Sequence, residues 1–244
     1  MTKLFSASLL VAVWGLTTLS ASGQESAAVQ KFDSDPAGSG KFYMGREIAR
    51  ARGERDIVWL ERPEREREEQ PAALMAALQL KSGEIVVDFG AGSGFYTFRL
   101  ARAVGARGTV LAADIEPKML AHIRRRAARE NLTNVGLVQS TASDPRLPLG
   151  RIDLALLVGV YHQLEFPLDV MRKIRSALKP GGRLVVVEHR QEDAGVPLEK
   201  ERKMSEAQLI TEMSAAGFVH VETIGALPSQ HIVVFGKTWN QDRP

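Results

Sequence analysis

The central part of the chain alternates short apolar runs with longer stretches in which apolar positions recur every three or four residues. The apolar runs cover residues 84–88, 109–114, 135–138, 152–158 and 183–188. Helical spacing occupies the stretches between them, at residues 95–104, 117–130 and 167–178. The first, fourth and fifth runs are apolar at nearly every position, which is typical of strands with helices on both faces. The pattern therefore predicts an α/β fold, doubly wound and Rossmann-like, around a mostly parallel sheet.

The pattern changes after the fifth run. Residues 191–202 are polar and predict a surface loop, and Ser205 can cap a helix that Gly217 ends. Two further apolar segments, residues 219–224 and 232–237, are joined by a short loop, which favours an antiparallel hairpin. The expected sheet therefore has seven strands, with an antiparallel strand near its C-terminal edge.

Residues 1–23 have the pattern of a secretory signal peptide. Lys3 gives a positive start, an apolar centre follows, and Ala21-Ser22-Gly23 offers small residues for cleavage. The apolar centre is shorter than the ~20 residues that a membrane span needs. If the segment is cleaved, we expect an exported protein, periplasmic or secreted, without a stable membrane span. The alternatives are an uncleaved anchor in the inner membrane, or a mis-chosen start codon and a cytoplasmic protein.

The stretch between this segment and the alternating region divides into two parts. Residues 24–42 are rich in Ser, Ala, Gly and Asp, which is the composition of a flexible linker. Residues 43–80 are predicted to form an N-terminal helical extension. Within it, residues 61–69 carry interleaved charges, which predicts a solvated helix face with local ion pairs. The main domain is expected over residues 81–240.

Composition excludes several kinds of function. The formal net charge of +3 over 244 residues gives no large electrostatic attraction to nucleic acid, so no nucleic-acid partner is expected. The chain has no cysteine, which excludes disulfides, thiolate metal sites and cysteine nucleophiles. No cluster of His, Asp and Glu in the sequence has the spacing of a metal site, and none is predicted.

The first apolar run ends in an acid and is followed by three glycines. The segment reads Asp88-Phe89-Gly90-Ala91-Gly92-Ser93-Gly94, which predicts a strand and a tight loop ahead of a helix. Glycine lets the backbone approach a ligand, and the N–H groups at a helix start can hold a polar or anionic group. The residue three positions after Gly92 is Phe95, so the spacing departs from the dinucleotide pattern G-x-G-x-x-G. No Lys-Ser/Thr pair follows, which excludes a P-loop.

Asp114 closes the second apolar run. In a doubly wound fold the ends of the first two strands lie side by side, and a carboxylate there can accept hydrogen bonds from both hydroxyls of a ribose. The alternative is an aspartate that caps the next helix. The flanking segments Leu111-Ala112-Ala113 and Ile115-Glu116-Pro117 favour the ribose interpretation.

Several segments, in this order along the chain, resemble the class I S-adenosylmethionine-dependent methyltransferases. They are residues 86–94, 110–120, 147–148, 152–162 and 178–188. The resemblance implies a methyltransferase domain over residues 81–240 with S-adenosyl-L-methionine as its cofactor. It also implies a small-molecule substrate that accepts the methyl group on O, N or C. The alternatives are a non-catalytic protein that binds the cofactor, and a methyltransferase that acts on a protein or a lipid.

The resemblance assigns the loop after the first run to the methionine part of the cofactor. Gly90, Gly92 and Gly94 would let the backbone approach it. Asp88 would contact its ammonium group, directly or through water.

The remaining cofactor contacts follow from the ends of the next strands. Asp114 would hold the ribose, and Ile115 would pack on the adenine. The family often has an acidic residue near the adenine amino group, and either Ser143 or Asp144 occupies that position, with Asp144 preferred. Val158, at the end of the fourth run, would lie where the methyl group meets the substrate.

The catalytic candidates follow the fourth run. A hydroxyl or ammonium acceptor must lose a proton, and histidine is the side chain best matched to neutral pH. His162 is the best-placed base, and its alternative role is a structural histidine at the strand end. Tyr161 is expected either to orient the substrate or to pack, and His189 is a second candidate at the rim.

Overall fold

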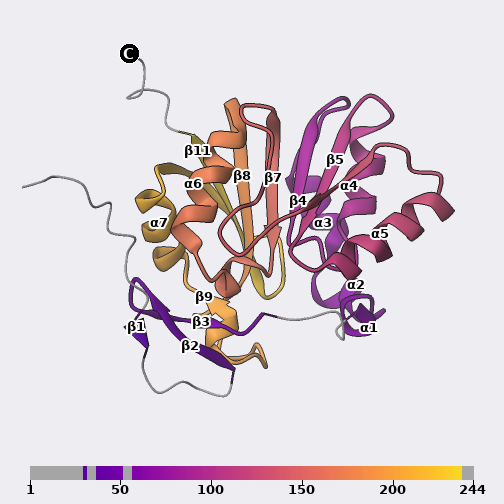
Figure 1. Ribbon diagram of the computed structural model, residues 1–244. Helices are drawn as coiled ribbons and strands as arrows, with labels where there is room; N and C mark the ends of the chain where they lie inside the picture. The colour runs from indigo at the N-terminus through magenta and orange to yellow at the C-terminus, as the bar shows by residue number, and fades with distance from the viewer. Residues whose placement is uncertain (1–29, 32–36, 52–56, 238–244) are drawn as a thin grey trace, which may run out of the picture.

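A central sheet runs through the whole alternating region of the chain (Figure 1). The computed structural model describes residues 30–31, 37–51 and 57–237. The longer strands are β4 (Ile85–Phe89), β5 (Thr109–Asp114), β6 (Val135–Gln139), β7 (Ile152–Val158), β8 (Leu178–Arg190), β10 (Phe218–Ile224) and β11 (Gln230–Lys237). They lie in the order β10-β11-β8-β7-β4-β5-β6. This arrangement confirms the doubly wound α/β fold predicted from the sequence.

The strand order places a crevice at the centre of the sheet. β4 pairs in parallel with both β5 and β7, although β7 follows β6 in the chain. The chain therefore crosses back over β4 after β6, and the strand order reverses between β4 and β7. In open α/β sheets, ligands bind outside the carboxyl ends of the strands at such a reversal.

The C-terminal hairpin is antiparallel, as predicted. β11 pairs in the antiparallel direction with β8 on one side and with β10 on the other. The sheet of the described residues nevertheless has eight strands, where seven were predicted. The additional strand is β9 (Lys203–Met204), which pairs with the end of β8. A strand of two residues is too short to show a period of two in the sequence, so the pattern does not predict it.

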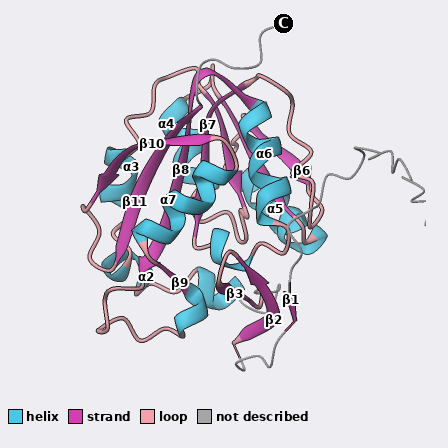
Figure 2. Ribbon diagram, turned by 90° about the vertical axis from the view of Figure 1, so that its left-hand side faces the viewer, coloured by secondary structure: helices cyan, strands magenta, loops and turns pink. Residues whose placement is uncertain are grey.

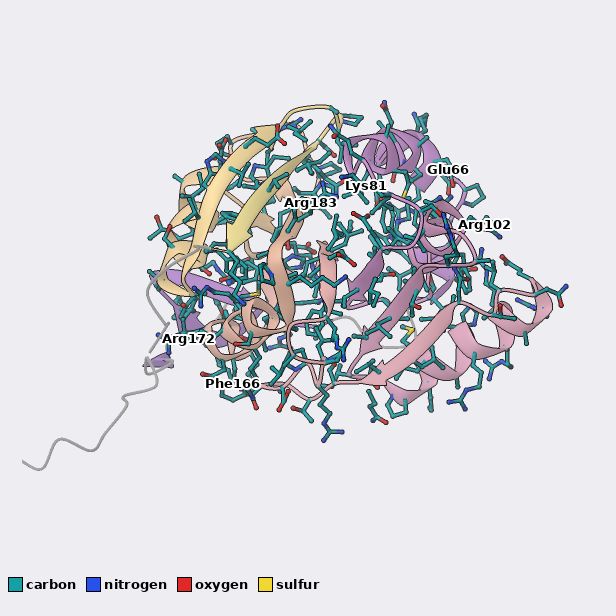
Figure 3. All side chains as sticks on the ribbon, turned by 90° about the horizontal axis from the view of Figure 1, so that it is seen from above. Glu66, Lys81, Arg102, Phe166, Arg172 and Arg183 are labelled. Carbon is teal, nitrogen blue, oxygen red and sulfur yellow. The ribbon has the colours of Figure 1, made fainter. Side chains whose placement is uncertain are left out.

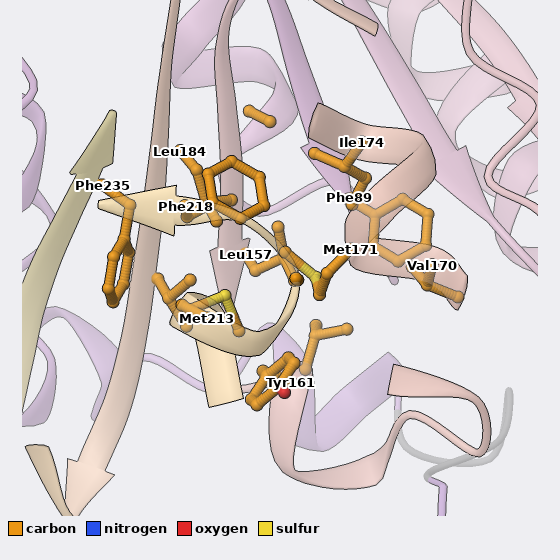
Figure 4. Close-up of a cluster of buried hydrophobic side chains, with 14 of the residues drawn as sticks. Phe89, Leu157, Tyr161, Val170, Met171, Ile174, Leu184, Met213, Phe218 and Phe235 are labelled. Atoms are coloured by element: carbon orange, nitrogen blue, oxygen red, sulfur yellow. The ribbon is translucent and has the colours of Figure 1, made fainter. Parts of the chain in front are cut away.

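Helices cover both faces of the sheet, and Figure 2 shows α6 and α7 in front of it. One face carries α3 (Pro71–Ala77), α4 (Thr97–Val104) and α5 (Pro117–Arg129), and the other carries α6 (Pro167–Ala177) and α7 (Glu206–Ala215). Side chains along β4 alternate between the two: Val86 packs with α3 and α4, whereas Val87 and Phe89 pack with α6 and α7. Figure 4 shows the cluster under α6 and α7, with Tyr161 at its lower edge.

The N-terminal extension begins with strands, so the helical prediction for residues 43–80 is wrong in its first part. β2 (Gly38–Tyr43) and β3 (Arg46–Ala49) form an antiparallel hairpin. The two turn residues, Met44 and Gly45, have φ angles of 46° and 91°. Positive φ at both central residues is the arrangement that joins two strands tightly. Only one of the two residues is a glycine, which hides this turn in the sequence.

Between residues 57 and 80 the extension has three short helices. It contains α1 (Ile57–Leu60) and α2 (Arg65–Glu68), followed by α3. The predicted linker, residues 24–42, includes β1 (Gln30–Lys31), which pairs with β2, so this part of the linker prediction is also wrong. Figure 1 shows the hairpin and the helices α1 and α2 beneath the lower edge of the sheet, where the carboxyl ends of the parallel strands lie.

Side chains of both charges cover the surface (Figure 3). Glu66 and Arg102 lie on one side of that view, and Arg172 lies on the opposite side. Within the described part of the chain, no helix is both long enough and apolar enough to cross a bilayer. The predicted signal segment, residues 1–23, lies outside the described residues.

Candidate active site

A cavity of about 220 Å³ lies at the carboxyl ends of β4, β5 and β7. Its walls come from the segments that follow four successive parallel strands, and from the N-terminal extension. The strand-end segments contribute lining residues within 88–96, 114–119, 140–142 and 158–165. The cavity therefore occupies the crevice that the strand order predicts.

The loop after β4 forms the wall nearest to the strand reversal. Gly90 has a φ of 75°, and a Cβ atom there would lie 2.5 Å from Val160 Cγ2, so only glycine fits between the two walls. Gly92 also lines the cavity, and its N–H donates to Asp114 Oδ2 at 2.8 Å. Gly94 does not line the cavity; its missing side chain makes room for the Phe98 ring instead.

Asp114 both fixes the turn before α5 and faces the cavity. Its Oδ1 accepts a hydrogen bond from the Glu116 N–H at 2.9 Å, at the start of α5, and its Oδ2 accepts from Gly92. The carboxylate also lines the cavity, and burial raises its pKa. Ile115 lines the cavity as well and is 47% exposed, so it offers a bare apolar surface to a ligand.

Asp88 is a buried carboxyl group in the same wall. It accepts a hydrogen bond from Thr97 Oγ1 at 2.5 Å. Burial raises its pKa to about 6 in spite of this hydrogen bond, which favours the charged form. A cation in the cavity would relieve the cost of burying this charge.

The wall after β6 is formed by other residues than predicted. Ser140, Thr141 and Ala142 line the cavity, whereas Ser143 and Asp144 do not. The Thr141 N–H donates to the Asp144 carbonyl at 2.8 Å, and this turn directs the Asp144 side chain outward. There its carboxylate pairs with Lys173 Nζ at 3.2 Å. Asp144, the preferred candidate for the adenine contact, therefore does not face the cavity.

The segment after β7 turns Tyr161 and His162 away from the cavity. Val158 lines the cavity, and the chain then enters a single 3₁₀ turn, η2 (Tyr161–Gln163). The Tyr161 hydroxyl donates to Glu212 Oε2 at 2.6 Å. The His162 ring lies beside Glu188, with Nδ1 at 2.8 Å from Glu188 Oε2. Both side chains are buried, and neither is among the residues that line the cavity.

The last residue of η2 and the two residues after it were not predicted and do line the cavity. They are Gln163, Leu164 and Glu165. The other histidine candidate, His189, lies at the end of β8 with Nδ1 at 3.3 Å from Ser229 Oγ, and burial lowers its pKa. After β7 and β8, closeness to the end of the strand therefore does not predict which side chains reach the cavity.

Sequence reasoning also missed the N-terminal contribution to the cavity. Leu60 and Arg65 line it, and Arg65 is buried together with Glu69. Arg65 donates from Nε to Glu69 Oε1 at 2.8 Å, and its guanidinium lies 3.9 Å from the centre of the Phe95 ring. The prediction of a solvated face for residues 61–69 is thus wrong for these two residues. An i,i+4 ion pair has the same sequence pattern on a buried face as on an exposed one.

The cavity lining contains a hydroxyl group and a guanidinium group that can still form hydrogen bonds with a ligand. Ser93 Oγ lines it, is buried, and has no hydrogen-bond partner in the described chain. Arg65 Nη1 donates to the Leu60 carbonyl at 2.6 Å, and no hydrogen bond joins its Nη2 to the described residues. Arg65 is the one cationic side chain among the described residues that line the cavity, which also holds Asp88 and Asp114. No group of His, Asp and Glu in the described ranges has the geometry of a metal site.

A doubly wound sheet with a strand-end carboxylate beside a glycine-rich loop defines a nucleoside-binding class of protein. Comparison with known proteins is more specific. The profile of a methyltransferase domain family matches residues 80–240. A solved S-adenosylmethionine-dependent methyltransferase of Aquifex aeolicus superposes with a TM-score of 0.71 at 24% identity, over 76% of this chain and 98% of that one.

Two curated relatives match shorter stretches. The ubiquinone/menaquinone biosynthesis C-methyltransferase UbiE of Azotobacter vinelandii is 34% identical over 110 residues, which are 45% of this chain and 44% of that protein. The aklanonic acid methyltransferase DauC of a Streptomyces species is 32% identical over 105 residues, 42% of this chain and 47% of that protein. The chain thus spans about half the length of these relatives. It belongs to the class I S-adenosylmethionine-dependent methyltransferase family.

Replacing Asp88 by asparagine tests the cost of its buried charge. Because burial raises the pKa of Asp88 from 3.8 to about 6, the native protein holds this proton more tightly than the unfolded chain does. The free energy of unfolding therefore falls as pH rises through this window. Asp88→Asn should make the ligand-free protein more stable than the wild type by about 1–3 kcal/mol at pH 7, with no difference at pH 4. Urea unfolding at both pH values measures this.

Asp144→Asn is the matched control, since the Asp144 carboxylate is exposed and its pKa is lowered by the Arg146 N–H and by Lys173. It should bring no gain at pH 7. A gain for Asp88→Asn of equal size at both pH values would contradict the burial of a titrating charge.

Proposed function

We propose that this protein transfers the methyl group of S-adenosyl-L-methionine to an oxygen, nitrogen or carbon atom of a small molecule. The proposal rests on one observation: two buried carboxyl groups, Asp88 and Asp114, line the same cavity at the strand reversal. A methyl donor with an ammonium, a sulfonium and a ribose diol complements them in charge and in hydrogen bonding.

We propose a position in the cavity for each part of the nucleoside. Asp114 is proposed to accept hydrogen bonds from the ribose hydroxyls, because its carboxylate faces the cavity and is already fixed by Gly92. The exposed face of Ile115 and the wall at residues 140–142 are proposed to hold the adenine. Asp88 is proposed to face the ammonium group, whose charge would lower the pKa of that carboxyl.

The N-terminal extension is proposed to supply the partner of the donor carboxylate. Arg65 Nη2 and Ser93 Oγ are both available in the same cavity. Arg65 is held in place by Glu69 and by the Phe95 ring. A charge-assisted hydrogen bond from a fixed guanidinium is among the stronger contacts that a carboxylate can receive. We therefore include Arg65 in the donor site.

The reaction asks little covalent chemistry of the protein. The bound donor supplies an electrophilic methyl group, and the surrounding residues position it against a nucleophile, exclude water and accept a proton where the nucleophile carries one. Val160 closes against Gly90 on the donor side, and Gln163, Leu164 and Glu165 continue the same wall. The acceptor is proposed to enter along this wall.

His162 is proposed to position the turn after β7, because its ring is buried beside Glu188 and does not line the cavity. Glu188 is fully buried and accepts from the backbone N–H of His162 at 3.2 Å as well as approaching its Nδ1. Burial alone would raise the pKa of Glu188, but the charge and the hydrogen bonds of His162 lower it. The two residues thus hold the turn that leads from β7 into the cavity wall at residues 163–165.

The names of the curated relatives support a small-molecule acceptor. UbiE is named as a C-methyltransferase of ubiquinone and menaquinone biosynthesis, and DauC as an aklanonic acid methyltransferase. Both names describe methyl transfer to a small organic molecule. We favour such an acceptor over a protein or a lipid surface.

A screen with a labelled methyl donor tests the proposed reaction. Incubation with a metabolite extract should transfer label to a small molecule, and His162→Ala should lower the rate about tenfold, because the turn beside the cavity loses its contact with Glu188. His122→Ala, on the outer helix α5, is the matched control and should keep the rate. Label transfer at the wild-type rate by His162→Ala would contradict the positioning role of His162, and no transfer by the wild type would refute the reaction.

Replacing Arg65 by methionine tests the donor site without an acceptor. Calorimetry should show that Arg65→Met weakens the binding of S-adenosylhomocysteine about 10- to 100-fold, the range for hydrogen bonds to a charged group. Binding of 5′-methylthioadenosine, which has no carboxylate, should stay unchanged, and Arg65→Lys should restore part of the affinity. Equal losses for both ligands would show that Arg65 only supports the fold.

A further inference from the structure

A buried ion pair joins the N-terminal hairpin to the body of the domain. Arg46 of β3 donates from Nε to Glu212 Oε1 at 2.8 Å and from Nη2 to Glu212 Oε2 at 3.1 Å. Glu212 lies on α7 with its side chain fully buried, and the Arg46 side chain is 13% exposed. Two parallel hydrogen bonds of this kind fix the orientation of both groups as well as their distance.

The same ion pair holds the 3₁₀ turn that follows β7. Glu212 Oε2 accepts from the Tyr161 hydroxyl at 2.6 Å, and Arg46 Nη1 donates to the His162 carbonyl at 3.0 Å. The Arg46 guanidinium also lies 5.2 Å from the centre of the Tyr161 ring. Gln208 completes the set, because its Nε2 donates to Glu212 Oε1 and to the Met44 carbonyl. We call Arg46, Glu212, Tyr161 and Gln208 the hairpin clamp.

A second contact joins the hairpin to the rim of the cavity. Lys41 of β2 forms an ion pair with Glu165, which lines the cavity. The two side chains are 33% and 42% exposed. We call the cavity lining at residues 158–165 the acceptor wall. The hairpin and the hairpin clamp contact it at two places, at the turn of Tyr161 and His162 and at Glu165.

The hairpin lies outside the part of the chain that matches the family, which begins at residue 80. A buried ion pair adds little net stability compared with apolar side chains of the same size, because both charges must leave water. It does fix one arrangement of the groups around it. We therefore interpret the hairpin clamp as a group of residues that positions residues 161–165, and not only as an anchor for the hairpin.

The ion pair at the rim also sets the charge of the acceptor wall. Glu165 is the one carboxylate among the lining residues 158–165, and Lys41 balances it. The remaining side chains of that wall are apolar or uncharged: Val158, Val160, Gln163 and Leu164. A wall with no net charge binds an uncharged molecule without leaving a buried charge unpaired.

We propose that the hairpin of residues 38–49 completes the acceptor site for an uncharged organic molecule, with the hairpin clamp and the Lys41–Glu165 pair acting as positioning residues for its wall. This inference rests on the proposed methyl transfer. The hairpin affects the binding and alignment of the acceptor, whereas donor binding is proposed for the loops after β4, β5 and β6 and for Arg65.

The experiment uses the full chain, labelled donor, and a metabolite extract passed over anion- and cation-exchange resins. Wild-type label transfer should be recovered with the unretained, uncharged fraction. Lys41→Met should raise the half-saturating amount of that fraction about fivefold, and Lys41→Arg should restore it. Tyr161→Phe should lower the maximal rate about tenfold by freeing the turn after β7. Both variants should bind S-adenosylhomocysteine like the wild type.

Lys179→Met is the matched control. Lys179 is 37% exposed and pairs with Asp153 at 2.7 Å, at the amino end of the sheet. Its loss should change neither the half-saturating amount nor the maximal rate.

The outcomes separate the inference from the proposed function. Wild-type transfer with unchanged kinetics in Lys41→Met and Tyr161→Phe would overturn the role of the hairpin, as would an equal loss of S-adenosylhomocysteine binding in these variants. Transfer only to a retained, charged fraction would overturn the uncharged acceptor. An absence of transfer by the wild type from every fraction would refute the proposed function itself.

Discussion

The hydrogen bond from the Gly92 N–H to the Asp114 carboxylate connects the two parts of the sheet on which the site depends. It joins the loop after β4 to the end of β5, at the edge where the strand order reverses. On its other side the loop lies close to Val160, because Gly90 has no side chain to keep them apart. The hydrogen bond thus holds the loop and the buried Asp114 carboxylate together in the lining of the cavity.

The sequence predicts this part of the molecule well, because it depends on local spacing. The alternation of apolar runs and amphipathic stretches determines which strands are parallel, and parallel strands bring their carboxyl ends to one edge. Asp88, Gly90, Gly92, Asp114, Ile115 and Val158 all follow or end such strands, and the structure places all of them in the cavity lining. No long-range contact had to be known to group them.

The parts that the sequence does not predict depend on contacts between distant segments. Asp144 turns outward because of a loop hydrogen bond, and Arg65 turns inward because it packs on Phe95. The turn of the hairpin has a methionine at positive φ. Methionine is not typical of such turns, so the sequence does not predict this one. Tyr161 leaves the cavity because Glu212, fifty-one positions later, accepts its hydroxyl. The spacing of residues along the chain does not reveal such contacts between distant segments. Most of them lie on the acceptor side of the cavity.

A crystal structure of the complex with S-adenosylhomocysteine tests the central claim most directly. We expect the nucleoside in the cavity, with both ribose hydroxyls hydrogen-bonded to the Asp114 carboxylate and the amino-acid part between Asp88 and Arg65. A ligand bound elsewhere, or a ribose that makes no contact with Asp114, would contradict it.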